Sequence, residues 1–232
     1  MIKKAKELAF PAVIVLSLIG IIIWQVALSE KINYYITSVA VLILSMLPFF
    51  FSFEAKKITS REITLISSLI ALAVISRAAF YLIPEVKPIA AVVIASAVCL
   101  GAERGYIVGA FSAFVSNFIF SQGIWTPFQM VALGLTGFFA GLIFKKLKAN
   151  RYSLAVFGFI FAAVVYGLIV DISTILVMFG DNLTFEGIIS VYAAGAPFNL
   201  VFGLSTAVFL FFFGEGFISK IERINTKYNL LS

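Results

Sequence analysis

Long apolar runs, separated by short polar segments, set the pattern of this chain. A helix needs about 20 apolar residues to cross the hydrocarbon core of a bilayer. Eight runs meet or approach that length: Leu8–Leu28, Asn33–Phe53, Ile63–Ile83, Ile89–Ala102, Gly105–Phe120, Phe128–Phe144, Tyr152–Phe179 and Ile188–Phe213. The fourth run would reach only about 21 Å at 1.5 Å per residue, and Pro197 breaks the last run. The pattern predicts an all-α integral membrane protein.

The composition supports a membrane protein and excludes several kinds of chemistry. The chain is 62% hydrophobic and 12% charged, whereas soluble domains are about half apolar and a quarter charged. It has no histidine and one cysteine, Cys99, which excludes histidine-based catalysis, His-ligated zinc and a CxxC metal site. The sequence also lacks the G-x-x-x-x-G-K-[ST] loop of ATPases. We therefore expect no ATPase site, no metal and no cofactor.

The basic residues predict how the chain is oriented. With the N-terminus in the cytoplasm, the inside segments hold 14 of the 17 lysines and arginines. The outside loops hold only Lys31 and Lys87, and Arg77 lies within a span. Cytoplasmic loops of membrane proteins are enriched in basic residues, so we expect a multi-pass protein of the plasma (cytoplasmic) membrane with both termini cytoplasmic. The net charge of +6 then reflects topology, and no nucleic-acid partner is expected.

One change in character divides the chain. A polar, charged connector at Glu54–Glu62 follows two apolar spans that contain no ionisable group, and the six later spans contain every charge that falls within a span. We predict an accessory transmembrane hairpin at residues 1–58 and a six-helix substrate-binding core at residues 59–232. Residues 1–29 also resemble a signal peptide, although their apolar run is longer than usual and favours a retained helix.

Two ionisable side chains lie inside spans, where a charge is costly. Arg77 and Asp171 both fall roughly 9–12 Å below the outer boundary at 1.5 Å per residue. They could form a structural ion pair between two helices. Alternatively, they could form the polar floor of a cavity that opens to the outside.

Helical periodicity assigns two faces to the span that contains Arg77. Ala73, Arg77 and Tyr81 recur every four residues and suit a polar pocket. The second face is offset by roughly 120° and is lined by small residues onto which another helix could pack. It consists of Ser67, Ala71, Val74 and Ala78. Small residues on a membrane helix also serve internal packing, so both uses of this face stay open.

Three further spans carry stripes of small and polar residues. The first consists of Gly101, Gly105, Gly109, Ala113 and Asn117, the second of Ala163, Gly167, Asp171, Thr174 and Met178, and the third of Asn199, Gly203 and Ala207. Such stripes favour close helix packing within the chain. Asn117 and Asn199 are the polar exceptions that could face a pocket.

The uncharged segment Ser121–Met130 is the most distinctive loop candidate. It combines turn-forming residues with Trp125 and two amides, Gln122 and Gln129. The segment could be an interfacial turn anchored by its tryptophan. It could also close over an uncharged or amphipathic ligand by stacking and hydrogen bonding.

From about Arg61 onward the chain resembles the substrate-specific S components of energy-coupling factor (ECF) vitamin transporters. The resemblance rests on Arg61-Glu62, on the turn Pro84–Pro88, on the glycines that follow Leu100 and on the segment Gln122–Met130. It implies a six-helix subunit that captures a vitamin outside and has no ATPase of its own. It also implies partners: a transmembrane coupling (T) subunit, which docks on small residues of the first core helix, and two cytoplasmic ATPases. The A-x-x-x-A docking pattern of the family maps onto Ser67 and Ala71, with serine in place of the first alanine.

The G-x-W-T-P loop is similar to that of S components assigned to cobalamin, which makes cobalamin our expected ligand. Position and chemistry select the candidate substrate-binding residues: Arg77, Tyr81, Asn117, Gln122, Trp125, Gln129, Asp171 and Asn199. Two alternatives stay open. One is a membrane-embedded enzyme that modifies lipids, and the other is an assembly subunit without a ligand.

Overall fold

The computed structural model describes residues 59–179 and 182–228, together with residues 20, 36, 38–41 and 43. Within these residues the regular secondary structure is helical and contains no strand, as the sequence predicts. The accessory hairpin at residues 1–58 lies almost entirely outside the described residues, so it stays a prediction.

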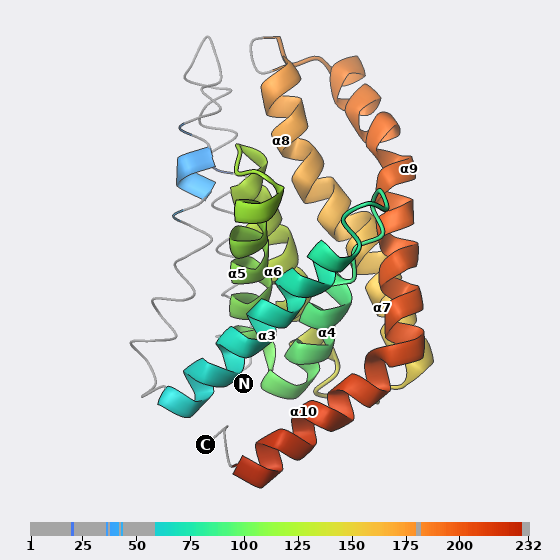
Figure 1. The fold of residues 1–232 in the computed structure, drawn as a ribbon. Helices are drawn as coiled ribbons and strands as arrows, with labels where there is room; N and C mark the ends of the chain where they lie inside the picture. Colours follow the sequence, from blue (N-terminus) through green and yellow to red (C-terminus); the bar gives the residue numbers. More distant parts are fainter. Residues whose placement is uncertain are drawn as a thin grey trace.

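From residue 59 onward, the described residues fold into six continuous helical segments (Figure 1). Their elements are α3 (Ser60–Ala79), α4 (Ile89–Leu100), α5 (Ala102–Phe120), α6 (Trp125–Ile143), α7 (Arg151–Ile160), the π-helical η1 (Phe161–Tyr166), α8 (Gly167–Phe179), α9 (Phe185–Phe209), the π-helical η2 (Leu210–Gly214) and α10 (Glu215–Tyr228). Elements α7, η1 and α8 form one segment, and α9, η2 and α10 form another. Four segments are long and apolar enough to cross a membrane: Ser60–Ala79, Trp125–Ile143, Arg151–Phe179 and Phe185–Tyr228. The protein is thus a multi-pass membrane protein.

Helix α4 is the short central element of the bundle. It has 12 residues and is largely buried, consistent with the short run that the sequence shows there. Gly101 separates it from α5 with a φ of 87°, a left-handed conformation that glycine adopts without steric cost. The chain therefore turns between two helices at a single residue.

Helices α5 and α6 pack together along a seam of glycines. A Cβ on Gly105 would lie 2.7 Å from the carbonyl oxygen of Gly137, and a Cβ on Gly109 would lie 2.2 Å from that of Leu133. Only glycine, whose side chain is a single hydrogen atom, permits the two backbones to approach so closely. Close approach of this kind is the usual role of small residues in membrane helices. The predicted close packing of the first small-residue stripe is thereby confirmed at Gly105 and Gly109, whereas Gly101 lies in the turn before α5 and a Cβ there would meet nothing within 4 Å.

The two other stripes pack against each other in an antiparallel register. A Cβ on Gly203 would lie 2.6 Å from Cβ of Ala163, and a Cβ on Gly167 would lie 2.5 Å from Nδ2 of Asn199. Farther along the same seam, a Cβ on Gly195 would lie 2.7 Å from Oδ2 of Asp171. The glycines make room for the polar side chains of the opposite helix.

Two local predictions need correction. Pro197 lies inside α9 and does not break it, because neighbouring groups in a membrane bundle can satisfy the backbone positions that a proline frees. The segment Ser121–Met130 is not one loop, since α6 already begins at Trp125. Pro127 is thus in the first turn of α6, where the missing N–H of a proline costs no helical hydrogen bond.

Polar contacts hold the two ends of α3 to α5. At its start, Glu62 is only 4% exposed and forms an ion pair with Nε of Arg104 on α5. At its end, Arg77 reaches across to the other end of α5. In Figure 1, helix α3 crosses the bundle at a steep tilt. The polar contacts at its two ends hold it against α5 in this orientation.

Candidate functional site

Arg77 lies in the last turn of α3 and points into the bundle. Its side chain is 8% exposed. Its Nη1 donates hydrogen bonds to Oγ of Ser116 at 2.5 Å and to Oδ1 of Asn117 at 2.9 Å. Both partners are uncharged and lie near the end of α5. A buried guanidinium is therefore held by neutral acceptors.

Asn117 is the centre of this network. The residue is 1% exposed, and its Nδ2 donates to Oγ1 of Thr126 at 2.9 Å and to Oε1 of Gln129 at 2.8 Å. The Thr126 hydroxyl also accepts the backbone N–H of Gly123 at 3.2 Å. One amide thus joins three helices, α3, α5 and α6, and connects them to the loop before α6.

An aromatic ring covers the guanidinium. The Cζ atom of Arg77 lies 4.3 Å from the ring centroid of Phe120, within the range of a cation–π contact. Tyr81 packs on the same ring, with centroids 5.3 Å apart. The buried Nε of Arg77 has no hydrogen-bond partner among the described residues. Burial of an unpaired donor is unfavourable, so this N–H is a candidate contact for a ligand.

Asp171 and Asn199 form a second polar cluster. Nδ2 of Asn199 donates to Oδ2 of Asp171 at 2.9 Å, and both residues are half-buried. On the same two helices, the hydroxyl of Tyr192 donates to the carbonyl oxygen of Leu168 at 3.1 Å. Among the described residues no ion pair joins Arg77 to Asp171. The structural-ion-pair interpretation of these two charges is therefore replaced by two separate clusters.

Gln122 and Trp125 lie outside both clusters. Gln122 is exposed and donates from Nε2 to the carbonyl oxygen of Phe114 at 3.0 Å. Trp125 is also exposed and folds its ring next to Gly123, where a Cβ would lie 2.4 Å from Cη2. Tyr81 is exposed as well, although it touches the network through Phe120.

Three members of the Arg77 network were missed by sequence reasoning: Ser116, Phe120 and Thr126. Ser116 and Phe120 lie inside an apolar run and do not stand out without knowledge of the neighbouring helix, while Thr126 lies within the segment Ser121–Met130 but was not selected from it. The only sequence feature that could have indicated them is their position beside Asn117 and Gln129, which were both selected.

The predicted docking face of α3 is divided by the fold. Ser67 and Ala71 are exposed, whereas Val74 is buried and Ala78 is half-buried. The exposed stripe continues instead over Thr64, Ser68 and Ile75. The hydroxyls of Thr64 and Ser68 donate to carbonyl oxygens of their own helix at 2.9 and 2.8 Å. The exposed face is therefore lined mainly by small residues, and the hydroxyl groups of Thr64 and Ser68 on it already donate hydrogen bonds within α3.

The described residues form an all-helical membrane bundle with two polar clusters between its helices, and comparison with known families identifies its class. Residues 57–216 match the model of the ECF-type riboflavin transporter S component. The match covers more than half of the chain, and the protein belongs to this family. No curated protein and no solved structure matches the chain. The predicted S component is thus confirmed at the level of the family, which consists of transport subunits rather than enzymes, while the cobalamin-type subgroup is not confirmed.

Proposed function

We propose that this protein captures riboflavin or a closely related flavin as the substrate-binding subunit of an ECF importer. The family match carries the proposal, since the matching model is the riboflavin S component. Riboflavin thus replaces cobalamin as the first candidate ligand, and cobalamin becomes the competitor in the binding test. Energy then comes from a coupling subunit and two ATPases, in keeping with the absence of a phosphate-binding loop in the sequence.

The two polar clusters offer the groups that an uncharged flavin needs. A flavin ring has carbonyl acceptors on both sides of one N–H donor and a flat face for stacking. The Nε of Arg77 is a donor without a partner. Asp171 keeps one carboxylate oxygen, Oδ1, outside its bond to Asn199 and can accept an N–H or O–H. We therefore propose Arg77 and Asp171 as the direct ligand contacts.

The other selected residues receive supporting roles in this proposal. Asn117 uses its amide for Arg77, Thr126 and Gln129, so it positions Arg77 rather than binding the ligand. Gln129 on α6 accepts a hydrogen bond from Asn117 and so orients the Arg77 cluster. Asn199 on α9 donates to Asp171 and so orients the second cluster. Tyr81, Gln122 and Trp125 are exposed and are proposed as the rim that the ligand passes.

The exposed face of α3 is proposed as the docking surface for the coupling subunit. Ser67 and Ala71 lie in its middle, and Ser68 extends it. Small side chains allow a partner helix to approach closely. Val74 is buried and is left out of this surface. The basic distribution further supports the proposal that both termini are cytoplasmic.

Flavin fluorescence provides a direct test of the ligand. Purified protein in detergent is titrated into riboflavin, and quenching of the flavin emission gives the dissociation constant. We expect tight binding that excess cyanocobalamin does not displace. Arg77→Ala and Asp171→Ala should each weaken binding at least tenfold, because each removes a hydrogen bond to a buried or partly buried charged group, worth about 1.5–3 kcal/mol.

Leu204→Trp, an exposed position on α9, is the matched control and should bind riboflavin as the wild type does. Binding of cyanocobalamin but not of riboflavin would transfer the proposal to cobalamin. If neither vitamin binds to well-folded protein, the proposed capture function is wrong. Unchanged affinity in folded Arg77→Ala would remove Arg77 from the site.

A further inference from the structure

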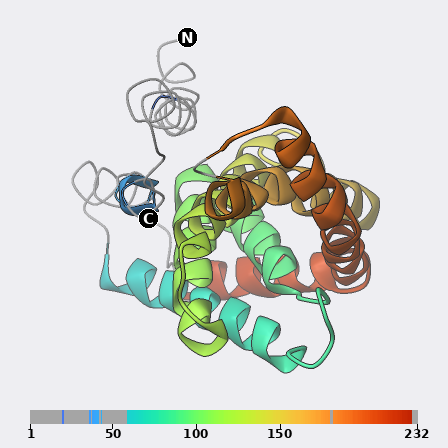
Figure 2. The same ribbon diagram turned by 90° about the horizontal axis from the view of Figure 1, so that it is seen from above.

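The last helix of the chain turns away from the membrane-spanning direction. Helix α9 continues through η2 into α10 without a loop. In Figure 1, α10 lies across the base of the bundle, below α4, and Figure 2 shows the same course from above. Helix α10 therefore lies where the bundle ends, not along its long axis.

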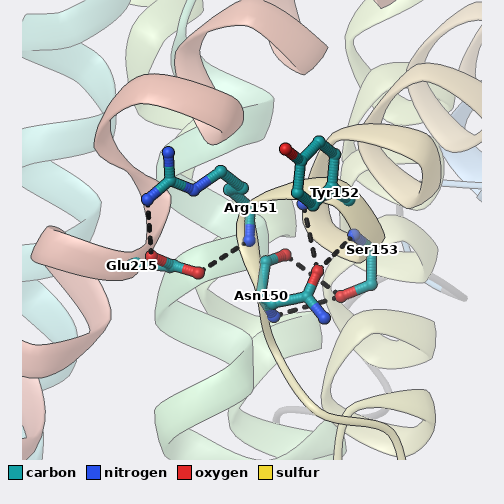
Figure 3. Close-up of polar contacts among 5 residues, drawn as sticks. All are labelled: Asn150, Arg151, Tyr152, Ser153 and Glu215. Carbon is teal, nitrogen blue, oxygen red and sulfur yellow. Dashed lines mark hydrogen bonds and ion pairs between the residues drawn. The ribbon is translucent and has the colours of Figure 1, made fainter.

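Specific contacts hold α10 in this position (Figure 3). Glu215, its first residue, accepts a hydrogen bond from the backbone N–H of Arg151 at 2.9 Å and lies 3.9 Å from the guanidinium of the same residue. Asn150 and Ser153 form a capping box that fixes the start of α7 beside it. Farther along, Ile218 and Ile221 are buried, and Sγ of Cys99 on α4 lies 3.7 Å from the carbonyl oxygen of Ile218.

The basic residues of α10 gather on one exposed stripe. At 100° per residue, Lys220, Arg223 and Lys227 fall within about 60° of one another, and all three are exposed. Glu222 falls on the opposite flank of the helix, and the charge of Glu215 is offset by Arg151. The stripe therefore carries an excess of positive charge.

An apolar edge runs beside the basic stripe. Ile224 and Tyr228 are 45% and 53% exposed, and by the same rotation they lie between the basic stripe and the buried isoleucines. Lys146 and Lys148, which follow α6 at the same end of the bundle, are exposed as well. An amphipathic helix with a basic face and exposed apolar residues suits the boundary between lipid headgroups and acyl chains.

We propose that α10 and the segment of residues 146–148 form a binding surface for anionic phospholipid headgroups. The basic stripe pairs with phosphate groups, while Ile224 and Tyr228 insert at the acyl boundary. Charge complementarity selects this occupant, because a row of basic side chains beside an apolar edge matches an anionic bilayer surface. The inference does not depend on the vitamin and would hold for any cargo.

Native mass spectrometry of the full chain tests the proposal. The protein is titrated with phosphatidylglycerol, with phosphatidylcholine and with inorganic phosphate, and individual binding constants are measured. A basic residue near an anionic surface contributes about 1 kcal/mol, or roughly fivefold in affinity. The triple variant Lys220→Gln, Arg223→Gln, Lys227→Gln should thus weaken phosphatidylglycerol binding on the order of a hundredfold and leave phosphatidylcholine unchanged.

Two further variants keep the test decisive. Glu222→Gln removes the negative charge on the opposite flank of α10, a charge that lowers the net positive charge of the helix, and should strengthen phosphatidylglycerol binding. Lys87→Gln, in the turn between α3 and α4, should have no effect. Equal binding of the two lipids, or unchanged phosphatidylglycerol binding in the triple variant, would overturn the proposal. So would loss of a protein partner in the triple variant with lipid binding retained, since the surface would then serve that partner.

Discussion

Asn117→Leu should destabilise the fold more than any other single change in the Arg77 network. Leucine has a similar size but can neither accept from Arg77 nor donate to Thr126 and Gln129. The substitution therefore removes three hydrogen bonds at a position that is 1% exposed. It also leaves the guanidinium with Ser116 as its remaining hydrogen-bond acceptor among the described residues.

The size of the effect follows from these contacts. Side-chain hydrogen bonds in membrane proteins average about 0.6 kcal/mol, so three of them account for roughly 2 kcal/mol. A buried donor without its partner costs a further 1–3 kcal/mol, and burial of the leucine methyl groups returns about 1 kcal/mol. We expect the free energy of unfolding to fall by about 2–4 kcal/mol.

Asn117→Asp is the matched control, because it keeps the acceptor for Arg77 and supplies a charge of opposite sign. Thr126 and Gln129 can both reorient to donate to the new carboxylate. We expect this variant to stay close to the wild type in stability. Reversible unfolding in mixed detergent micelles measures both variants. A loss below about 0.5 kcal/mol for Asn117→Leu, or an equal loss for Asn117→Asp, would refute the reasoning.

Two more predictions concern the packing surfaces. Gly109→Val places side-chain carbon against backbone, since a Cβ there would lie 2.2 Å from the carbonyl oxygen of Leu133. The α5–α6 seam must then open, and thermal unfolding in detergent should show a loss of about 1–3 kcal/mol, whereas Gly216→Val, where a Cβ meets nothing within 4 Å, should cost far less. Ala71→Trp on the exposed face of α3 should preserve riboflavin binding but prevent co-purification with the coupling subunit. Normal co-purification of this variant would show that the coupling subunit docks elsewhere.

Much of the fold could be predicted from the sequence because apolar length and small-residue spacing are local properties. The runs near Ile63, Phe128 and Tyr152 correspond to helices in the structure. The four-residue recurrence of Gly105 and Gly109 correctly indicated close packing within the chain. These features depend only on helix geometry, which repeats along one element.

The arrangement of the polar groups could be predicted only in part. Arg77 and Asp171 were selected because each is costly inside a span, yet their similar depth did not bring them together. Depth along a helix says nothing about the direction in which a side chain points around the bundle. Asp171 meets Asn199 because Gly167 leaves room for the Asn199 side chain and Gly195 leaves room for the Asp171 carboxylate between the helices. That register depends on how two helices pack, which one sequence does not specify.

The contacts of α3 also bear on how an S component would move. The helix with the proposed docking face is joined to α5 at both ends, through the Glu62–Arg104 ion pair and through Arg77 with Ser116 and Asn117. Helix α5 in turn packs on α6 so closely that a single methyl group would collide with backbone at Gly105. A force applied to α3 by a partner is therefore transmitted to the α5–α6 pair without a flexible joint. This rigidity favours reorientation of the bundle as one body over a hinge motion of its first core helix, and it directly couples the docking face to the network that holds Arg77.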